Sequence, residues 1–226
     1  MGTVAPCKKW LSITDRLAQA FTQPNLSNHE GFGYKPISVR SHQSAILRSE
    51  KRNMEQVVLV DEQDKELGTM EKLEAHRVGA LHRALSVFIY NTAGEMLLQK
   101  RNTDKYHSGG LWTNTCCSHP RPGEPIADAA VRRLKEEMGL ATELTEKFSF
   151  VYKAHFDNGL IEHEFDHVFV GTTNEPPIPD PDEVAAYVYV SKNFLLADLA
   201  SHPEKYTEWF KLCWHMVDES VNAGKF

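Results

Sequence analysis

Apolar side chains recur at regular intervals in only part of the chain. Residues 1–53 show no sustained periodicity and are interrupted by Pro, Asn and Gly, so we predict little structure there beyond a short helix near Leu11–Phe21. From Met54 onward, short apolar runs alternate with polar turns. The pattern therefore predicts a flexible N-terminal extension over residues 1–53 and one folded domain over residues 54–226.

Most of the apolar runs in this domain are short, which predicts strands. We expect strands at Val57–Val60, at Ala84–Tyr90 and through Leu97–Leu98, with turns at Asp61–Asp64 and Asn91–Gly94. Two longer segments, Phe148–Phe156 and Leu160–Val170, flank Asp157-Asn158-Gly159, which is the strongest hairpin signal in the chain. A loop rich in Pro and Asp is expected over residues 174–182, followed by a strand at Tyr187–Val190.

Two segments show helical spacing instead. The predicted helix 125–138 has an apolar stripe of Ala127, Ala130, Val131, Leu134 and Met138, and Gly139 is placed to end it. The predicted closing helix has an apolar face of Trp209, Leu212, Cys213, Met216 and Val217. Strands with a central helix and helices at the end favour an α+β fold or a three-layer sandwich.

Composition and charge narrow the class of protein. Hydrophobic residues make up 41% of the 226 residues, enough for a substantial core, and no apolar run approaches the ~20 residues of a membrane-spanning helix. Residues 1–53 carry 8 Lys and Arg against 3 Asp and Glu, which leaves the predicted domain clearly acidic. We therefore expect a soluble protein with no nucleic-acid partner and no membrane span.

The basic, Ser-containing extension has two interpretations. It could be a targeting peptide, although Asp15 and Glu30 are atypical of one, or it could be an uncleaved extension or an over-long start with Met54 as the true beginning. Four irregularly spaced cysteines are too few for a disulfide framework in a chain of this length. They favour a reducing compartment, and we expect the protein to be cytoplasmic.

Glu162 and Glu164 lie at i and i+2 on one predicted strand, so both carboxylates share a face. They form either the solvated polar face of an edge strand or part of a cation site, because a metal ion turns their mutual repulsion into attraction. His76, His82 and His119 could supply imidazole ligands, and such a mixed site would suit Mn, Fe, Zn or Mg. Sequence spacing alone does not show that these five residues converge.

Two further positions could carry chemistry. Cys117 has His119 and Asn114 nearby and follows Gly109-Gly110, which indicates a tight active-site loop, whereas Cys116 and Cys213 are expected to be buried thiols. On the predicted helix, Glu137 lies beside the apolar stripe and Arg133 lies one turn before it. This is either an ordinary ion pair or a group that holds a divalent ion near a diphosphate, with nearby cations on the phosphate oxygens.

Together these motifs resemble a known family. Glu124, Arg132, Leu134 and Glu136–Leu140 resemble a degenerate Nudix box, in which Ser118 replaces the usual first glycine and Arg133 replaces a glutamate. With Trp112-Thr113-Asn114-Thr115-Cys116-Cys117-Ser118-His119-Pro120, Leu81-His82-Arg83-Ala84 and Glu162-His163-Glu164, the chain resembles type 1 isopentenyl-diphosphate delta-isomerases from about Met54 to the closing helix. The cysteine motif is highly specific.

The resemblance implies a Nudix-like mixed β-sheet sandwiched between helices and an enzyme that interconverts isopentenyl and dimethylallyl diphosphate in isoprenoid biosynthesis. It implies an acid/base pair, Cys117 and Glu164, and a ligand set for Mn²⁺ or Zn²⁺, namely His76, His82, His119, Glu162 and Glu164. It also implies a Mg²⁺ that arrives with the diphosphate and is held by Glu137, diphosphate contacts from Lys72, Arg101, Lys105 and Arg133, and aromatic residues Tyr152 and Trp209 near the isoprenoid. The partner is a small-molecule substrate, and a monomer is favoured.

Other functions stay open. A Nudix-type diphosphate hydrolase would release phosphate, and Arg133 and Ser118 disfavour it. A metal-binding module without catalysis would leave the substrate unchanged. If Tyr152 and Glu164 do face one pocket, the hairpin needs an odd number of loop residues, because the side-chain period of a strand is two. We therefore predict a three-residue loop with a left-handed Gly159.

Overall fold

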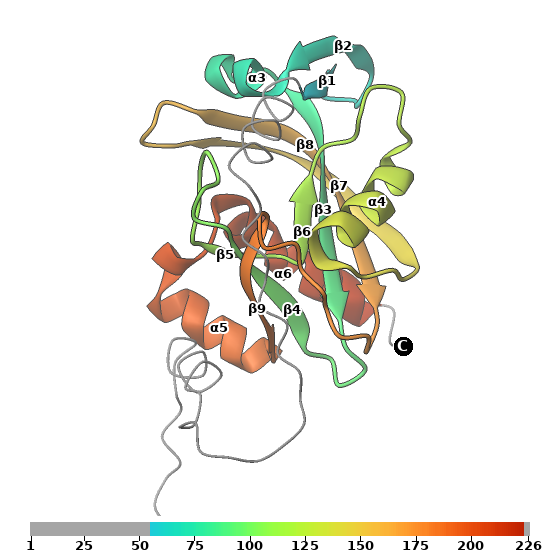
Figure 1. Cartoon of the computed structure of the whole chain (residues 1–226), viewed down its shortest axis with the longest axis vertical. Helices are drawn as coiled ribbons and strands as arrows, with labels where there is room; N and C mark the ends of the chain where they lie inside the picture. Colours follow the sequence, from blue (N-terminus) through green and yellow to red (C-terminus); the bar gives the residue numbers. More distant parts are fainter. Residues whose placement is uncertain (1–54, 224–226) are drawn as a thin grey trace, which may run out of the picture. The chain divides into compact units, whose positions relative to one another are not determined.

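The structure is a computed structural model of the chain and describes residues 55–223 (Figure 1). The predicted extension and its short helix lie outside the described residues. The strands are β1 (Gln56–Val60), β2 (Glu66–Glu71), β3 (His82–Tyr90), β4 (Met96–Arg101), β5 (Trp112–Thr113), β6 (Cys116–Ser118), β7 (Leu144–His155), β8 (Ile161–Thr172) and β9 (Val184–Val190). The helices are α3 (Lys72–Val78), α4 (Ile126–Met138), α5 (Lys192–Ser201) and α6 (Glu208–Ala223), with a 3₁₀ turn at Pro203–Lys205.

The sheet is organised around β3. One edge of β3 pairs along its whole length with β8, and these two strands are parallel. The other edge is shared by three antiparallel strands in succession, β1 at the start of β3, β6 in its middle and β4 at its end. β2 extends the sheet beyond β1, β7 beyond β8, and β5 and β9 beyond β4. The sheet is therefore mixed, as predicted.

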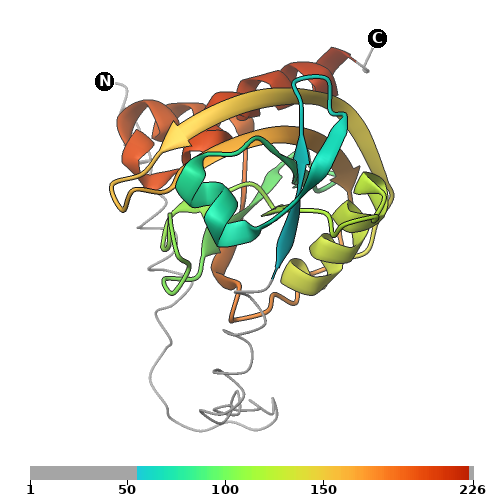
Figure 2. The ribbon, with the colours of Figure 1, turned by 90° about the horizontal axis from the view of Figure 1, so that it is seen from above.

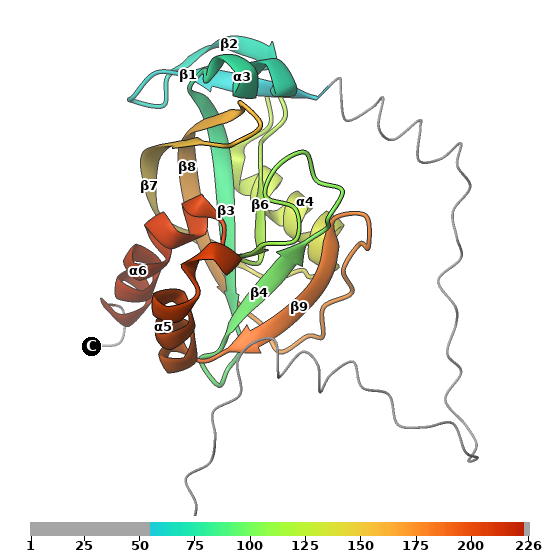
Figure 3. The ribbon, with the colours of Figure 1, turned by 90° about the vertical axis from the view of Figure 1, so that its left-hand side faces the viewer.

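Helices cover both faces of this sheet. Leu85, Val87 and Ile89 alternate along β3 and pack with Leu134 and Met138 of α4 in one buried cluster. On the opposite face the Phe88 ring stacks on Phe210 of α6, with ring centroids 6.1 Å apart. Figure 3 shows α4 on one side of β3 and α5 and α6 on the other. The predicted α+β sandwich is confirmed.

Most predicted elements are present, but some residues predicted to be buried on the two helices are exposed. The strands and turns expected before Arg101, the 174–182 loop and the closing helix are all found. On α4, however, Ala127 and Val131 are exposed, and the buried side of the helix includes Ala129 and Glu137 instead. On α6, Leu212 is 44% exposed and Phe210 takes its place in the core. The centre of each predicted stripe is buried and only its edge differs, because neighbouring apolar positions on a helix do not say exactly where the buried side ends.

The β7–β8 hairpin confirms the parity argument. Tyr152 pairs with Glu164, and Phe156 N–H donates to Leu160 O over 2.9 Å, which leaves a three-residue loop. Gly159 has φ = 80°, a left-handed conformation that glycine adopts without a Cβ penalty. Figure 2 shows this long hairpin running between α6 and the β1–β2–α3 segment. The N-terminal half of β8 is the part of this hairpin that contributes Glu162 and Glu164 to the candidate site.

Candidate active site

The short helix α3 was not predicted, although it positions two of the predicted site residues. It follows Glu71, whose side chain accepts hydrogen bonds from the N–H groups of Leu73 and Glu74 at 2.9 and 2.8 Å. Lys72 is its first residue and His76 lies one turn later, on the side that faces the sheet. Seven residues are too few for a helical period to stand out in the sequence.

β3 and β8 supply the next donors. His82 begins β3 and pairs directly with Glu164 of β8, so both side chains point to the same face. Glu162, two residues earlier, shares this face, and both carboxyl groups are almost fully buried at 4% and 6% exposure. β8 lies between β3 and β7 inside the sheet, which excludes the interpretation of this pair as a solvated edge-strand face.

His76, His82, His119 and Glu164 bring their ligand atoms within 4.8 Å of one another. His76 Nδ1 must donate to Lys72 O (2.7 Å) and His82 Nδ1 to Ala80 O (2.8 Å), because a carbonyl only accepts. With Nδ1 engaged in this way, Nε2 is the ring nitrogen of both residues that is left to face the cluster. His82 Nε2 lies 3.2 Å from His119 Nε2, which lies 2.9 Å from Glu164 Oε1.

These distances fit a metal site. Ligand bonds of ~2.1 Å in an octahedron place neighbouring donor atoms about 3 Å apart and opposite donors about 4.2 Å apart. Burial is the main cause that lowers the pKa of His76 to about 4 and that of His119 to about 3, so both rings are neutral and able to ligate at pH 7. The four donors form the first set of the cluster, and the chemistry of the set suits Mn, Fe or Zn.

Glu162 does not belong to this first set. Instead, Glu162 forms a second set with His76 and His107, and the ligand atoms of this set also lie within 4.8 Å of one another. His107 Nε2 is 3.2 Å from Glu162 Oε1. The structure thus joins four of the five predicted ligands directly and links the fifth to them through His76.

Tyr152 connects the two carboxyl groups. Its hydroxyl lies 2.6 Å from Glu164 Oε2 and 3.0 Å from Glu162 Oε2. Burial, together with the charge of Glu164, holds the pKa of Glu162 well above its usual range. Burial alone would raise the pKa of Glu164 as well, but the hydrogen bond from His119 is the largest of the causes that hold it well below its usual range. The pair therefore holds one ionised and one protonated carboxyl group.

Cys117 lies on β6 and lines the same pocket as Glu162 and Glu164. It pairs with Ser86 of β3, which turns its thiol to the face opposite the α4 core, whereas the neighbouring Cys116 is fully buried in that core. Burial is the main cause that raises the pKa of Cys117 to about 12, although the charge of Arg101 opposes it. Arg101 Nη1 is 3.6 Å from Cys117 Sγ, and its guanidinium carbon lies 5.2 Å from the centre of the Trp209 ring. The thiol is therefore protonated at neutral pH.

The predicted diphosphate contacts gather at one side of this pocket. Lys72 pairs with Glu55 over 3.1 Å, and Lys105 pairs with Glu183. Arg133 Nη2 lies 2.5 Å from Glu137 Oε1 and 3.8 Å from Glu183 Oε2. The ordinary ion pair between Arg133 and Glu137 is thus present. Each of these three cations already faces a carboxylate, which an incoming diphosphate would have to replace.

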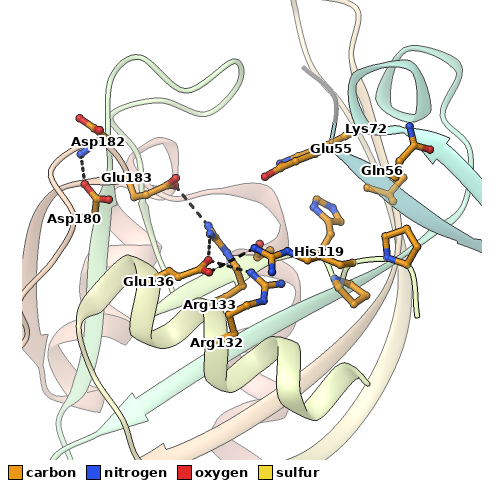
Figure 4. Close-up of a pocket in the computed structure, with 15 residues that line it drawn as sticks. Glu55, Gln56, Lys72, His119, Arg132, Arg133, Glu136, Asp180, Asp182 and Glu183 are labelled. Atoms are coloured by element: carbon orange, nitrogen blue, oxygen red, sulfur yellow. Dashed lines mark hydrogen bonds and ion pairs between the residues drawn. The ribbon is translucent and has the colours of Figure 1, made fainter. Parts of the chain in front are cut away.

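Two adjoining pockets share Lys72, Ser118, His119 and Arg133. The outer one has a volume of about 540 Å³ and is open, and Figure 4 shows Arg132, Arg133 and Glu136 projecting into it from α4 opposite Glu55 and Lys72. The inner one is narrow, at about 50 Å³. All the predicted site residues except His76 and His82 line it. They are Lys72, Arg101, Lys105, Cys117, His119, Arg133, Glu137, Tyr152, Glu162, Glu164 and Trp209.

Sequence reasoning missed several residues of this inner pocket. His107, Tyr106 and Ser86 line it, and Gln99 Nε2 donates to Glu137 Oε2 over 3.1 Å beneath it. Tyr106 and His107 come shortly before Gly109-Gly110, the pair that indicated a tight active-site loop. This position in the sequence was the one signal that could have marked them as site residues. Ser86 and Gln99 lie within apolar strands. A single polar residue at a position expected to be buried is a signal for a functional or structural role.

The chain is similar to known proteins over most of its length. The NUDIX domain family matches residues 80–210. Isopentenyl-diphosphate Delta-isomerase 1 of Aromatoleum aromaticum is 55% identical over 159 residues, which cover 70% of this chain and 90% of that protein. The chain belongs to the type 1 isopentenyl-diphosphate delta-isomerase family, within the Nudix superfamily. The corresponding isomerase of Pectobacterium atrosepticum is 51% identical, over 75% of this chain and 95% of that protein.

Solved structures agree on the fold of this isomerase-family chain. A crystal structure from Deinococcus radiodurans superposes with a TM-score of 0.56 at 20% identity, over 66% of this chain and 90% of that one. A MutT protein from Methanosarcina mazei gives a TM-score of 0.52 at 18% identity, over 62% and 95%. Both likenesses establish the Nudix fold only. Among the described helices, none is both long and apolar enough to cross a membrane.

Proposed function

We propose that this protein interconverts isopentenyl diphosphate and dimethylallyl diphosphate by adding a proton at one carbon and removing one at another. The observation that carries the proposal is the placement of Cys117 and Glu164 in one narrow pocket with their pKa values shifted in opposite directions. The pocket thus holds a protonated acid and an ionised base. Relatives with about 50% identity that are named for this reaction support the assignment.

The proton transfers follow from these two states. The Cys117 thiol donates a proton to the terminal carbon of isopentenyl diphosphate, which leaves a tertiary carbocation, and the Glu164 carboxylate removes a proton from C2 to form the new double bond. Both groups are restored before the next turnover by proton exchange with each other or with solvent. The reverse reaction uses the same groups in exchanged roles.

The surroundings of the pocket serve the cation. The Trp209 ring, whose N–H donates to Asn114 Oδ1 over 3.2 Å, offers a π-face that stabilises positive charge, and Tyr152 fixes the orientation of Glu164. The inner pocket is narrow, and exclusion of water prevents capture of the cation as an alcohol. Lys72, Arg101, Lys105 and Arg133 bind the diphosphate and thereby anchor the reacting carbons.

Divalent ions complete the proposal. His76, His82, His119, Glu162 and Glu164 would hold Mn²⁺ or Zn²⁺, and Glu137 would hold a Mg²⁺ that comes with the diphosphate. Held by these residues, such an ion would supply positive charge that favours the ionised form of Glu164 and its orientation. The buried free thiols Cys116 and Cys213 favour a reducing compartment, and we place the reaction in the cytoplasm.

Incubation with isopentenyl diphosphate in heavy water tests the function directly. The isomerase yields deuterated dimethylallyl diphosphate with the diphosphate intact, observed by NMR and mass spectrometry. Release of phosphate would instead establish a diphosphate hydrolase. Recovery of unlabelled substrate from metal-loaded protein would leave a metal-binding module without catalysis.

A further inference from the structure

We propose that His107 is an additional metal ligand of the His/Glu cluster, bound through Nε2 on the side of Glu162. The inference deepens the proposed function, since it rests on a metal ion at that cluster. It extends the five-residue ligand set to six donors, four imidazoles and two carboxylates. His107 lies on the loop between β4 and β5, an element that contributes no other ligand to the predicted set.

The two donor sets meet at a single atom. His76 belongs to both sets, and its Nδ1 is already engaged with Lys72 O, so only its Nε2 can ligate. One nitrogen lone pair binds one ion. An ion bound at His76 Nε2 would therefore have His82, His119 and Glu164 on one side and Glu162 and His107 on the other. The six donors do not form one group within 4.8 Å, so the side chains would have to draw in around such an ion.

The His107 ring is oriented toward this position. The residue is 6% exposed, and its Nε2 is buried with no hydrogen-bond partner of acceptable geometry, although Glu162 Oε1 lies 3.2 Å away. A buried imidazole nitrogen without a hydrogen bond is costly unless something else satisfies it. A metal ion between His107 and Glu162 would satisfy both groups.

The ring is also fixed in place before any ion arrives. It stacks on Phe156 with centroids 4.8 Å apart and meets the edges or faces of Tyr106 and Trp209 at right angles, at 4.3 and 6.0 Å. Its main-chain carbonyl accepts a hydrogen bond from Arg101 Nη2 over 3.3 Å. Nδ1 lies 3.3 Å from Ser108 Oγ, which can accept its proton and leave the Nε2 lone pair facing the cluster. Such support from outside the ligand shell is typical of metal-binding histidines.

Six donors complete an octahedron, the geometry that Mn²⁺ and Mg²⁺ prefer, but four of the six are imidazoles. Imidazole ligands favour Mn, Fe, Co and Zn over Mg, which takes oxygen ligands and keeps bound water. His107 would therefore make the site more selective for transition metals than the three-histidine set alone. An ordinary core histidine would instead leave metal affinity unchanged when replaced.

Metal binding by the full-length protein provides the test, without reference to turnover. Metal-free wild type, His107→Ala and His107→Gln are titrated with Mn²⁺ and Zn²⁺ against a chelator, with folding checked by circular dichroism. We expect both variants to bind more than ~100-fold more weakly, beyond the ~10- to 100-fold typical of residues that only support a ligand. The control is His155→Gln, an exposed histidine at the end of β7, which should bind like wild type.

Glutamine distinguishes a ligand from a buried polar group, because its amide can donate a hydrogen bond to Glu162 but does not replace an imidazole as a metal ligand. Wild-type affinity in His107→Gln would overturn the inference and leave the five-residue site intact. Failure of the wild type to bind either metal would overturn the inference together with the metal site of the proposed function.

A measurement on wild type alone covers the case in which the variants do not fold. In the Co²⁺-loaded protein, each imidazole that ligates through Nε2 and keeps its Nδ1 proton gives one exchangeable, strongly shifted NMR resonance. We expect four such resonances. Three would show that His107 does not ligate.

Discussion

Replacing Cys117 by alanine separates the proposed acid from the metal scaffold that surrounds it. The substitution removes the thiol proton but none of the His and Glu donors, so fold and bound metal should persist. Because both proton transfers are obligatory, turnover should fall by at least the ~10²- to 10⁴-fold typical of one acid/base group. By transition-state arithmetic this is a barrier increase of about 3 to 5 kcal/mol.

The preceding residue provides a matched control. Cys116 has the same side chain on the same strand but points into the α4 core with no exposed surface. Cys116→Ala removes one buried atom the size of a methylene group, so we expect a loss of about 1 kcal/mol in unfolding free energy and turnover near wild type.

The assay combines three measurements on each variant: the rate of dimethylallyl diphosphate formation, metal content, and the urea midpoint. The result that would refute the reasoning is a Cys117→Ala protein with full metal and near wild-type turnover, which would make Cys117 a packed thiol. Equal loss of activity in both variants would show that the strand, and not the thiol, is what matters.

Further predictions concern the metal, the pH dependence, the hairpin and the extension. Glu164→Gln should be inactive and bind metal more weakly, whereas Glu162→Gln should lose metal but regain some rate in excess metal; rate plotted against bound metal separates the two. Because burial lowers the pKa of His76 to about 4 from 6.5, its neutral form stabilises the metal-free protein above pH 6.5, and this contribution is lost as pH falls toward 4. Thermal melts from pH 7 to 4 should show a shallower decline in His76→Gln. Gly159→Ala should cost about 1 kcal/mol in urea unfolding, because φ = 80° strains any residue with a Cβ although no atom lies within 4 Å. A chain that starts at Met54 should keep its kinetics and melting temperature, and loss of folding on truncation would contradict that.

The sequence predicted most of the fold because its signals were local. Asp157-Asn158-Gly159 set the hairpin, and the parity of Tyr152 and Glu164 then set the loop length, both of which the structure confirms. Gly139 was expected to end α4, and it does so with φ = 67°. The predicted apolar stripes on α4 and α6 were confirmed in most positions, and only Ala127, Val131 and Leu212 are exposed. These three were wrong because the sheet, and not the helix itself, decides which of several apolar residues is buried.

The candidate site was harder to predict in full. The residue motifs, together with the family that they resemble, indicated thirteen positions, and eleven of them line one pocket. The split of the donors into two sets joined by His76 could not be read from spacing, because it depends on how α3 and the loop before β5 approach the sheet. For the same reason the motifs did not reveal His107. Its ring contacts Phe156 and Trp209, which lie far from it in the sequence.

The arrangement around β3 has a consequence for how the chain is made. During synthesis β1, β4 and β6 emerge before α4, so one edge of β3 can be paired early, while the other must wait for β8. Until then the apolar segment around Val87 and Phe88 presents unpaired backbone to other nascent chains, which is a route to aggregation. The strand that completes the edge is also the one that brings Glu162 and Glu164. A chain in which β8 has not yet formed is therefore both prone to aggregate and catalytically inactive. Conditions that slow translation or lower chaperone capacity should reduce the yield of folded protein before they reduce its specific activity.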